Sequence, residues 1–177
     1  MKRPAILALI LALCAATAVP SALAAEIIAV CFTPGGACTD VVVDQIASAQ
    51  QQVLVQAYSF TSPEIVTALA AAKRRGVDVQ VILDKSNVCK DGAMCEKKGA
   101  IAAETLEIAG VPVLIDRIHG IAHNKVMIVD GIRVITGSFN FTRAAQARNA
   151  ENLLVIKDQG LAGRYVRNWR ERAKYSR

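Results

Sequence analysis

The sequence predicts an α/β fold: a mixed, largely parallel sheet flanked by helices on both faces. Short β-branched strands alternate with amphipathic helices along most of the chain. The strands over residues 53–58 and 77–83 are apolar on both sides, which is typical of strands covered by helices. One helix joins them, and a strand, helix and strand at this spacing form a right-handed parallel crossover. Residues 25–177 are about one domain long, so we expect a single domain.

The first 24 residues have the pattern of a secretory signal peptide. Lys2 and Arg3 precede an apolar stretch over residues 5–19, and the small residues Ala22 and Ala24 mark a cleavage position after Ala24. The stretch is shorter than the roughly 20 apolar residues that span a bilayer. We therefore expect a periplasmic or secreted protein without stable membrane association.

The first half of the mature chain contains an apolar strand, a helix and the predicted crossover. The strand over residues 26–32 ends at the turn signal Pro34-Gly35-Gly36, and a helix over residues 39–51 follows. The crossover helix over residues 63–72 begins with Ser62 as N-cap and Pro63 at its first position. Basic residues before Gly76 fit the negative end of the helix dipole, so they need no ligand.

The second half begins with a polar loop over residues 86–99 and then alternates again. Asp130 and Gly131 separate two β-rich runs and form a strong hairpin signal. The pattern predicts helices over residues 101–109 and 159–176, and strands over residues 111–115, 121–129, 132–137 and 152–156.

Four cysteines remain after removal of the predicted signal peptide: Cys31, Cys38, Cys89 and Cys95. An even number in an oxidising compartment predicts disulfides. Three pairings are possible, and the short separations favour Cys31 with Cys38 and Cys89 with Cys95. A zinc site is the alternative, but these separations exceed the spacing of usual zinc motifs.

Charge and histidine content constrain the partners. The chain has 21 basic and 15 acidic side chains, and loss of Lys2 and Arg3 leaves 19 basic ones and a net charge of +4. This surplus suits a polyanion without identifying one. His119 and His123 have helical spacing, but Gly120 and the strand pattern argue against a helix there. We therefore expect no metal or other cofactor, and we place His119 in a loop near the site.

Polar side chains gather on one face of the predicted hairpin. His123 and Lys125 are two residues apart on a strand, so they point the same way. A two-residue turn at Asp130 and Gly131 would pair Val129 with Ile132. The same register pairs Lys125 with Thr136 and His123 with Ser138. Asn140 would then project to the same face. An imidazole, an ammonium, a hydroxyl and an amide at one place can bind and attack a phosphate.

These residues resemble the signature of a known family. His123 and Lys125, Asp130 after four intervening residues, and the run Gly137 to Asn140 are similar to the H-x-K-x4-D and G-S-x-N motifs of the phospholipase D superfamily. The single copy and short length are most similar to its small bacterial endonuclease branch. The resemblance implies the phospholipase D/nuclease fold, with residues 25–177 as one catalytic domain of a metal-independent phosphodiesterase.

The resemblance also implies roles for individual residues. His123 would form a phosphohistidine, Lys125, Ser138 and Asn140 would bind the phosphate, and Glu151 would orient the histidine. Asp130 belongs to the signature as a catalytic candidate, although its turn position favours a role in fixing the backbone.

A single motif copy has a further consequence. One imidazole cannot both attack the phosphorus and protonate the oxygen leaving on the opposite side. Members of the superfamily use two copies of the motif, so a chain with one copy implies a homodimer with a shared active site.

Three functions fit these residues. We expect a nonspecific endonuclease that hydrolyses DNA, with RNA as a further candidate substrate. A phospholipase D acting on phospholipid headgroups is the alternative with the same catalytic residues. A nucleic-acid-binding module with a dead site is disfavoured because every signature residue is present. The last helix carries a basic stripe that can follow a nucleic acid, or can simply be solvated: Arg164, Arg167, Arg170 and Lys174.

Overall fold

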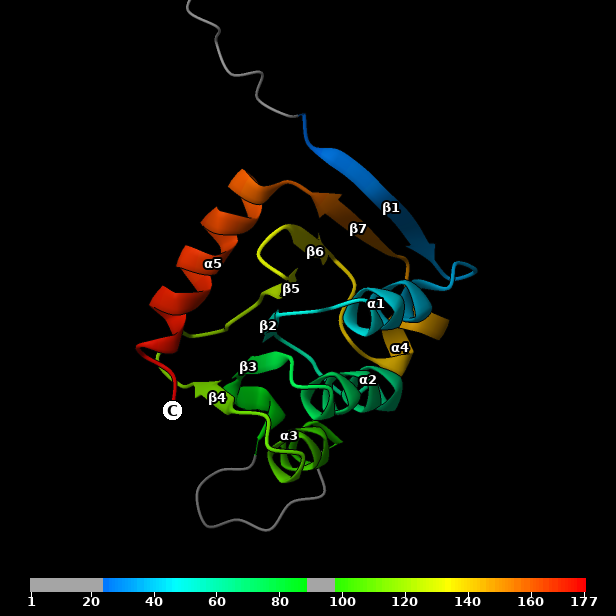
Figure 1. Ribbon diagram of the computed structural model, residues 1–177. Helices are drawn as coiled ribbons and strands as arrows, with labels where there is room; N and C mark the ends of the chain where they lie inside the picture. The colour runs from blue at the N-terminus through cyan, green and yellow to red at the C-terminus, as the bar shows by residue number, and fades with distance from the viewer. Residues whose placement is uncertain (1–23, 89–97) are drawn as a thin grey trace, which may run out of the picture.

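The computed structural model describes residues 24–88 and 98–177. The predicted signal peptide, apart from Ala24, and the predicted Cys89 to Cys95 disulfide lie outside the described residues. Seven strands form one sheet in the order β1-β7-β6-β5-β2-β3-β4 (Figure 1). The strands are β1 (Glu26–Thr33), β2 (Gln52–Ala57), β3 (Asp78–Asp84), β4 (Val113–Asp116), β5 (Lys125–Val129), β6 (Arg133–Gly137) and β7 (Glu151–Lys157).

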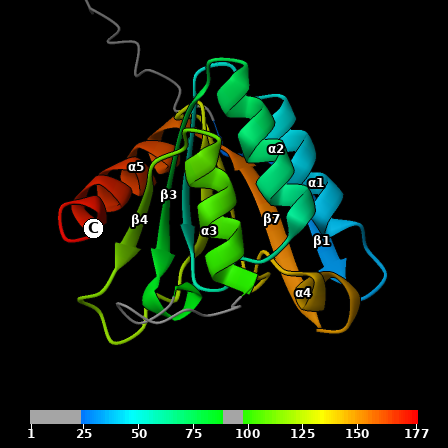
Figure 2. The same ribbon diagram turned by 90° about the horizontal axis from the view of Figure 1, so that it is seen from below.

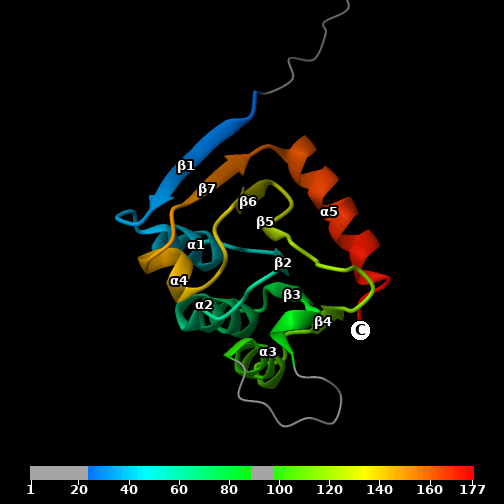
Figure 3. The same cartoon turned by 180° about the vertical axis from the view of Figure 1, so that it is seen from behind.

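Helices cover both faces of the sheet, as predicted. Helices α1, α2 and α3 lie on one face and α5 lies on the other (Figures 1 and 3). The helices are α1 (Cys38–Ala47), α2 (Pro63–Arg74), α3 (Lys98–Ile108), α4 (Arg143–Ala147) and α5 (Gln159–Ala173), with a 3-10 turn η1 (Lys85–Asn87). The short helix α4 was not predicted, although Thr142 caps it by accepting from the Ala145 N–H.

The α/β class and the mixed sheet are confirmed, but the expectation of a largely parallel sheet is wrong. Only the pairs β2 with β3 and β3 with β4 are parallel, and the other four neighbouring pairs are antiparallel. Parallel neighbours need a crossover, which α2 and α3 provide. The later strands β5 and β6 join through a short turn, so they pair antiparallel.

Two apolar cores hold the layers together. The larger core lies between the sheet and the helices α1 to α3, and it includes the buried strand residues Val55, Val81 and Met127. The smaller core lies under α5, where Trp169 packs against the opposite side of the sheet. The Trp169 indole N–H donates to the Val55 carbonyl at 2.9 Å, which satisfies its polar atom within the core.

Several local predictions are confirmed. The Ser62 hydroxyl accepts from the Ile65 N–H at the start of α2. A disulfide joins Cys31 at the end of β1 to Cys38 at the start of α1. This link closes the Pro-Gly-Gly turn between the edge strand and the helix layer.

The hairpin forms at the predicted turn, but its register differs by one residue from the prediction. Asp130 and Gly131 both adopt positive φ, and the Ile132 N–H donates to the Val129 carbonyl. However, the ladder pairs Val129 with Arg133, so Ile132 is an extra residue in the loop. Its carbonyl accepts from the Asp158 N–H, which explains why it leaves the ladder. Lys125 and His123 are therefore not opposite Thr136 and Ser138.

Candidate active site

The candidate nucleophile and its cation lie where β5 begins. Lys125 is the first residue of β5, and His123 precedes it in an extended segment rather than in the strand that the sequence predicted from residue 121. The two side chains still point the same way, because His123 Nε2 and Lys125 Nζ lie 3.1 Å apart. The imidazole belongs to an exposed residue, whereas Lys125 is only 8% exposed. A substrate can therefore reach the histidine while the ammonium is held beneath it.

An aromatic side chain that the sequence analysis missed completes this arrangement. The Tyr58 ring lies 4.6 Å from the His123 ring, and Lys125 Nζ lies 5.2 Å from the Tyr58 centroid. Pairing of β2 with β5 brings Tyr58 here, since its N–H donates to the Asn124 carbonyl at 2.8 Å. The ring limits the positions open to the imidazole and faces the ammonium with its π-system.

Burial sets the protonation of Lys125. Desolvation lowers the pKa of this ammonium from its usual value, and the negative charge of Glu151 partly opposes that change. Glu151 is the first residue of β7, which begins at the same end of the sheet as β5, two strands away. The site thus contains a buried cation with a carboxylate near it.

Ser138 and Glu151 form a hydrogen-bonded pair at the ends of β6 and β7. The Ser138 hydroxyl donates to Glu151 at 2.6 Å, and the Asn149 amide donates to the other carboxylate oxygen at 2.9 Å. Among the described residues no hydrogen bond joins Glu151 to His123, so within one chain this carboxylate orients Ser138. The predicted contact of Glu151 with the histidine stays a prediction.

Gly137 is required where the chain leaves β6. Its φ is +151°, and any Cβ at this position would collide with the Asn152 carbonyl. That carbonyl accepts from the Ser138 and Phe139 N–H groups at 3.1 and 3.2 Å. This close approach holds Ser138 beside Glu151 and explains the glycine of the G-S-x-N run.

Asn140 continues the alternation after Ser138. Phe139 and Phe141 are each 1% exposed and pack in the core, whereas Ser138 and Asn140 are half-buried. The Asn140 amide oxygen is buried without a hydrogen-bond partner within the described part of the chain. This oxygen can only accept, so it would not bind a phosphate oxygen, and the predicted contact of Asn140 with substrate stays a prediction.

The structure separates Asp130 from the other candidates. Asp130 lies past the far end of β5 and His123 lies before its start, so the whole strand, roughly 17 Å long, lies between them. Its carboxylate accepts from the N–H groups of Gln50, Gln51 and Gln52 at 2.8–3.1 Å and pairs with Arg133 at 3.1 Å. Asp130 thus stabilises the hairpin turn by binding the chain before β2 and the Arg133 side chain.

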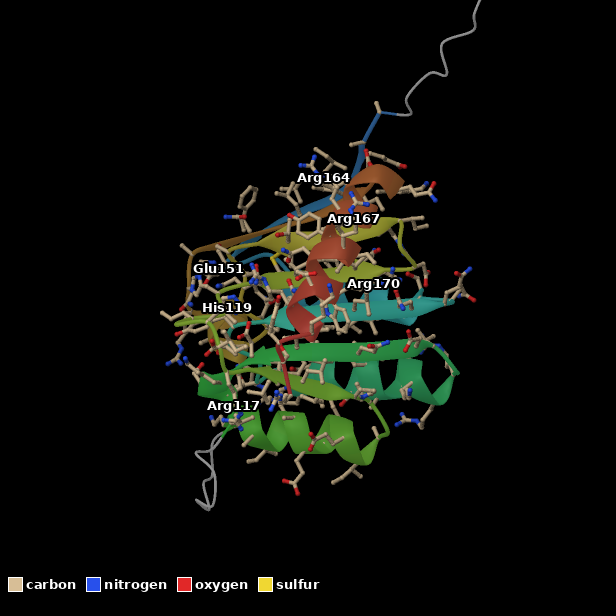
Figure 4. The ribbon with its side chains drawn as sticks, turned by 90° about the vertical axis from the view of Figure 1, so that its left-hand side faces the viewer. Arg117, His119, Glu151, Arg164, Arg167 and Arg170 are labelled. Atoms are coloured by element: carbon tan, nitrogen blue, oxygen red, sulfur yellow. A yellow bond between two sulfur atoms is a disulfide. The ribbon has the colours of Figure 1, made fainter. Side chains whose placement is uncertain are left out.

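His119 lies in a loop between β4 and β5, as predicted. Its Nδ1 is 2.7 Å from the buried Asp116 carboxylate, and its Nε2 is 2.6 Å from Arg172 of α5. Both ring nitrogens therefore have protein partners, which does not fit a metal ligand. Figure 4 shows His119 and Glu151 at the same end of the strands, while Arg164, Arg167 and Arg170 project from α5.

Within residues 24–88 and 98–177, no group of three or more His, Cys, Asp or Glu side chains is arranged to hold a metal ion. None of the helices in these ranges is long and apolar enough to cross a membrane.

Comparison with known proteins places the chain in a family. Residues 42–172 match the family model described as "Cardiolipin synthase, PLD-like domain". The chain is 45% identical over 145 residues to a protein from Rickettsia conorii named phospholipase D, covering 82% of this chain and 68% of that protein.

Solved structures agree with this match. Nuc from Salmonella typhimurium, described as a phospholipase D family member, superposes with a TM-score of 0.78 at 37% identity, covering 87% of this chain and 97% of Nuc. NucT from Helicobacter pylori shares the fold with a TM-score of 0.74 at 21% identity, covering 86% of this chain and 98% of NucT. By its sequence motifs, its fold and these matches, the chain belongs to the phospholipase D superfamily.

Proposed function

We propose that this chain is a metal-independent phosphodiesterase that cleaves nucleic acid without sequence specificity, with DNA as the principal substrate and RNA as a further one. The observation that carries the proposal is the exposed His123 imidazole, with Nε2 3.1 Å from the buried Lys125 ammonium. The first group can attack phosphorus, and the second can neutralise the charge that develops on the nonbridging oxygens. Neither step requires a metal ion.

The proposed reaction has two steps. His123 Nε2 attacks phosphorus, the P–O bond to the leaving oxygen breaks, and that oxygen takes a proton from a general acid on the opposite side. Water then attacks the phosphohistidine, transfers its proton to the group that acted as the acid, and releases a phosphate monoester and free His123. Lys125 binds the phosphoryl oxygens in both steps, and Ser138 and Asn140 add hydrogen bonds.

The general acid in this proposal is His123 of a second copy of the chain. The only other histidine, His119, has both nitrogens engaged by Asp116 and Arg172. A two-fold axis beside the exposed His123 would bring two imidazoles to opposite sides of one phosphate. The protein is then a homodimer with a shared active site, and a strictly monomeric active enzyme would contradict this step.

Two further observations support nucleic acid as the substrate. The chain has a surplus of basic side chains, and Arg164, Arg167 and Arg170 are exposed along α5 (Figure 4). The similarity to Nuc, at 37% identity over nearly the whole of that chain, also supports this proposal. Export to the periplasm or medium, directed by the signal peptide, is part of the same proposal.

Phospholipid headgroup hydrolysis is the second candidate, because the relative named phospholipase D is 45% identical. The decisive experiment compares turnover of single-stranded DNA and phosphatidylcholine by the purified protein in excess EDTA. We expect DNA cleavage that persists in EDTA and is abolished in His123→Ala, with nucleic-acid binding retained. Lipid turnover without DNA cleavage would reverse the choice of substrate, and activity only after addition of a divalent cation would refute the mechanism.

A further inference from the structure

A hollow of about 610 Å³ opens at the same end of the sheet as His123. Its lining comes from the first turns of α2 and α3, from α4, and from the segments that lead into these helices. In Figure 2 the start of α3 and the helix α4 lie at the end of the sheet where the β3 and β4 arrows point. The volume is within the range of about 300–1,000 Å³ that is usual for small-molecule sites.

Two chain segments connect the hollow directly with the candidate active site. Ser59 lines the hollow and follows Tyr58, whose ring lies 4.6 Å from that of His123. On the other side, Arg148 lines the hollow and precedes Asn149, which donates to the site carboxylate. The hollow and the candidate active site are therefore neighbours along the chain at two places.

Among the described residues, the charged side chains that line the hollow are all basic: Lys98, Arg143 and Arg148. Arg143 makes a 3.4 Å pair with Glu64 at the exposed surface. Arg148 is exposed and has no hydrogen bond or ion pair through its side chain within the described ranges. An anion would supply the partner that the Arg148 guanidinium lacks.

The remaining walls combine apolar and hydroxyl-bearing side chains. Val66 and Ala102 are buried, and Ile101 is 55% exposed although it is a large apolar residue. Thr67 and Thr105 add hydroxyl groups from α2 and α3. The Thr105 hydroxyl already donates to the Ile101 carbonyl, but an acyl chain would offer no partner to the cations of the lining, which is unfavourable. A sugar and a base match both kinds of wall.

From this lining we infer that the hollow is a subsite for the nucleotide next to the scissile phosphate. Arg148 and Lys98 bind the flanking phosphate, and the nucleoside lies against Ile101 and the start of α2. This inference rests on the proposed nucleic-acid activity and adds to it a specific place for the substrate chain within one subunit.

The test compares two substrates in matched variants. The substrates are a single-stranded oligonucleotide and bis(p-nitrophenyl) phosphate, a small diester without flanking nucleotides. The pocket variants are Arg148→Ala, which removes the cation, and Thr105→Trp, which fills the hollow from an exposed helix position. Their controls are Arg74→Ala and Glu107→Trp, exposed positions outside the lining.

We expect each pocket variant to lower the ratio of kcat/KM for the oligonucleotide to kcat/KM for the small diester by about tenfold, the effect of one lost phosphate contact. The controls should keep the wild-type ratio. Unchanged ratios in both pocket variants, with both substrates still cleaved, would overturn the subsite but leave the phosphodiesterase standing. Failure of the wild type on both substrates would overturn the proposed function itself. Loss of phosphatidylcholine turnover alone in the pocket variants would assign the hollow to lipid and overturn the nucleotide subsite.

Discussion

Replacement of Asp130 by asparagine should destabilise the protein without removing a group from the reaction centre. Asparagine tolerates the positive φ of 54° at this position, so the substitution tests the carboxylate rather than the backbone. The carboxylate is 11% exposed and accepts from three successive backbone N–H groups and from Arg133. The asparagine amide would keep one acceptor oxygen and turn an NH2 group toward the Arg133 guanidinium.

The magnitude follows from these contacts. A hydrogen bond to a charged group contributes about 1.5–3 kcal/mol and a neutral one about 0.5–1.5 kcal/mol, so each of the three N–H bonds loses roughly 1 kcal/mol. Summed over the three bonds, we expect the free energy of unfolding to fall by about 3 kcal/mol, with coupling between these neighbouring contacts as the main source of departure from that sum. For a domain of this length that corresponds to a drop of about 6–12 °C in Tm.

The pH dependence gives a second readout. Burial opposes ionisation of Asp130, but the backbone N–H groups and Arg133 outweigh it and hold its pKa below the usual value. The stabilisation is therefore complete above the unfolded pKa of about 3.9 and is lost as the pH falls through the lower folded pKa. The wild type and Asp130→Asn should differ at pH 7 and converge in acid.

Thermal and urea unfolding of Asp130→Asn measure these changes, with the exposed Asp44→Asn as the matched control. Activity should be measured well below the Tm of the variant. An unchanged Tm together with abolished turnover would refute this reasoning and return Asp130 to the catalytic residues.

Three further perturbations test the site. Burial lowers the pKa of Lys125, so kcat/KM should begin to fall at a lower pH than it would with an ordinary lysine. Lys125→Arg stays charged, so its pH profile should lack this alkaline decrease. The same decrease in the variant would assign it to another group. Tyr58→Ala should lower kcat/KM by about tenfold through loss of the ring beside His123. Tyr58→Phe keeps the ring and should have a kcat/KM near that of the wild type. Equal losses in the two variants would attribute the effect to the hydroxyl. Gly137→Ala should lower the free energy of unfolding by about 2–4 kcal/mol because the added Cβ would collide with the Asn152 carbonyl. The control Gly163→Ala in α5 should be neutral or stabilising. A stable and active Gly137→Ala would show that the backbone at the end of β6 can relax.

The gathering of His123 and Lys125 could be predicted from the sequence because it depends only on local geometry. Side chains two residues apart in an extended chain share a face, and this holds although β5 begins two residues after His123. The Cys31 to Cys38 link was predictable for the same reason, since the short separation limits the choice. The helix N-cap at Ser62 likewise follows from neighbouring residues.

Contacts between distant segments could not be predicted in this way. The sheet order sets β2 beside β5, and only that pairing brings Tyr58 to His123. One extra residue at Ile132 shifts the hairpin ladder, because Asp158 binds its carbonyl from elsewhere in the chain.

The sequence by itself determined the fold class, the family motif and the pair of groups proposed to do the chemistry, since local spacing and residue type encode them. The tertiary structure decided that most of the sheet is antiparallel, that Asp130 holds the hairpin at the far end of β5, and that a hollow with basic lining residues opens at the same end of the sheet as His123. These features arise where segments far apart in the chain meet, and strand pairing and packing, rather than local preference, decide which segments do so.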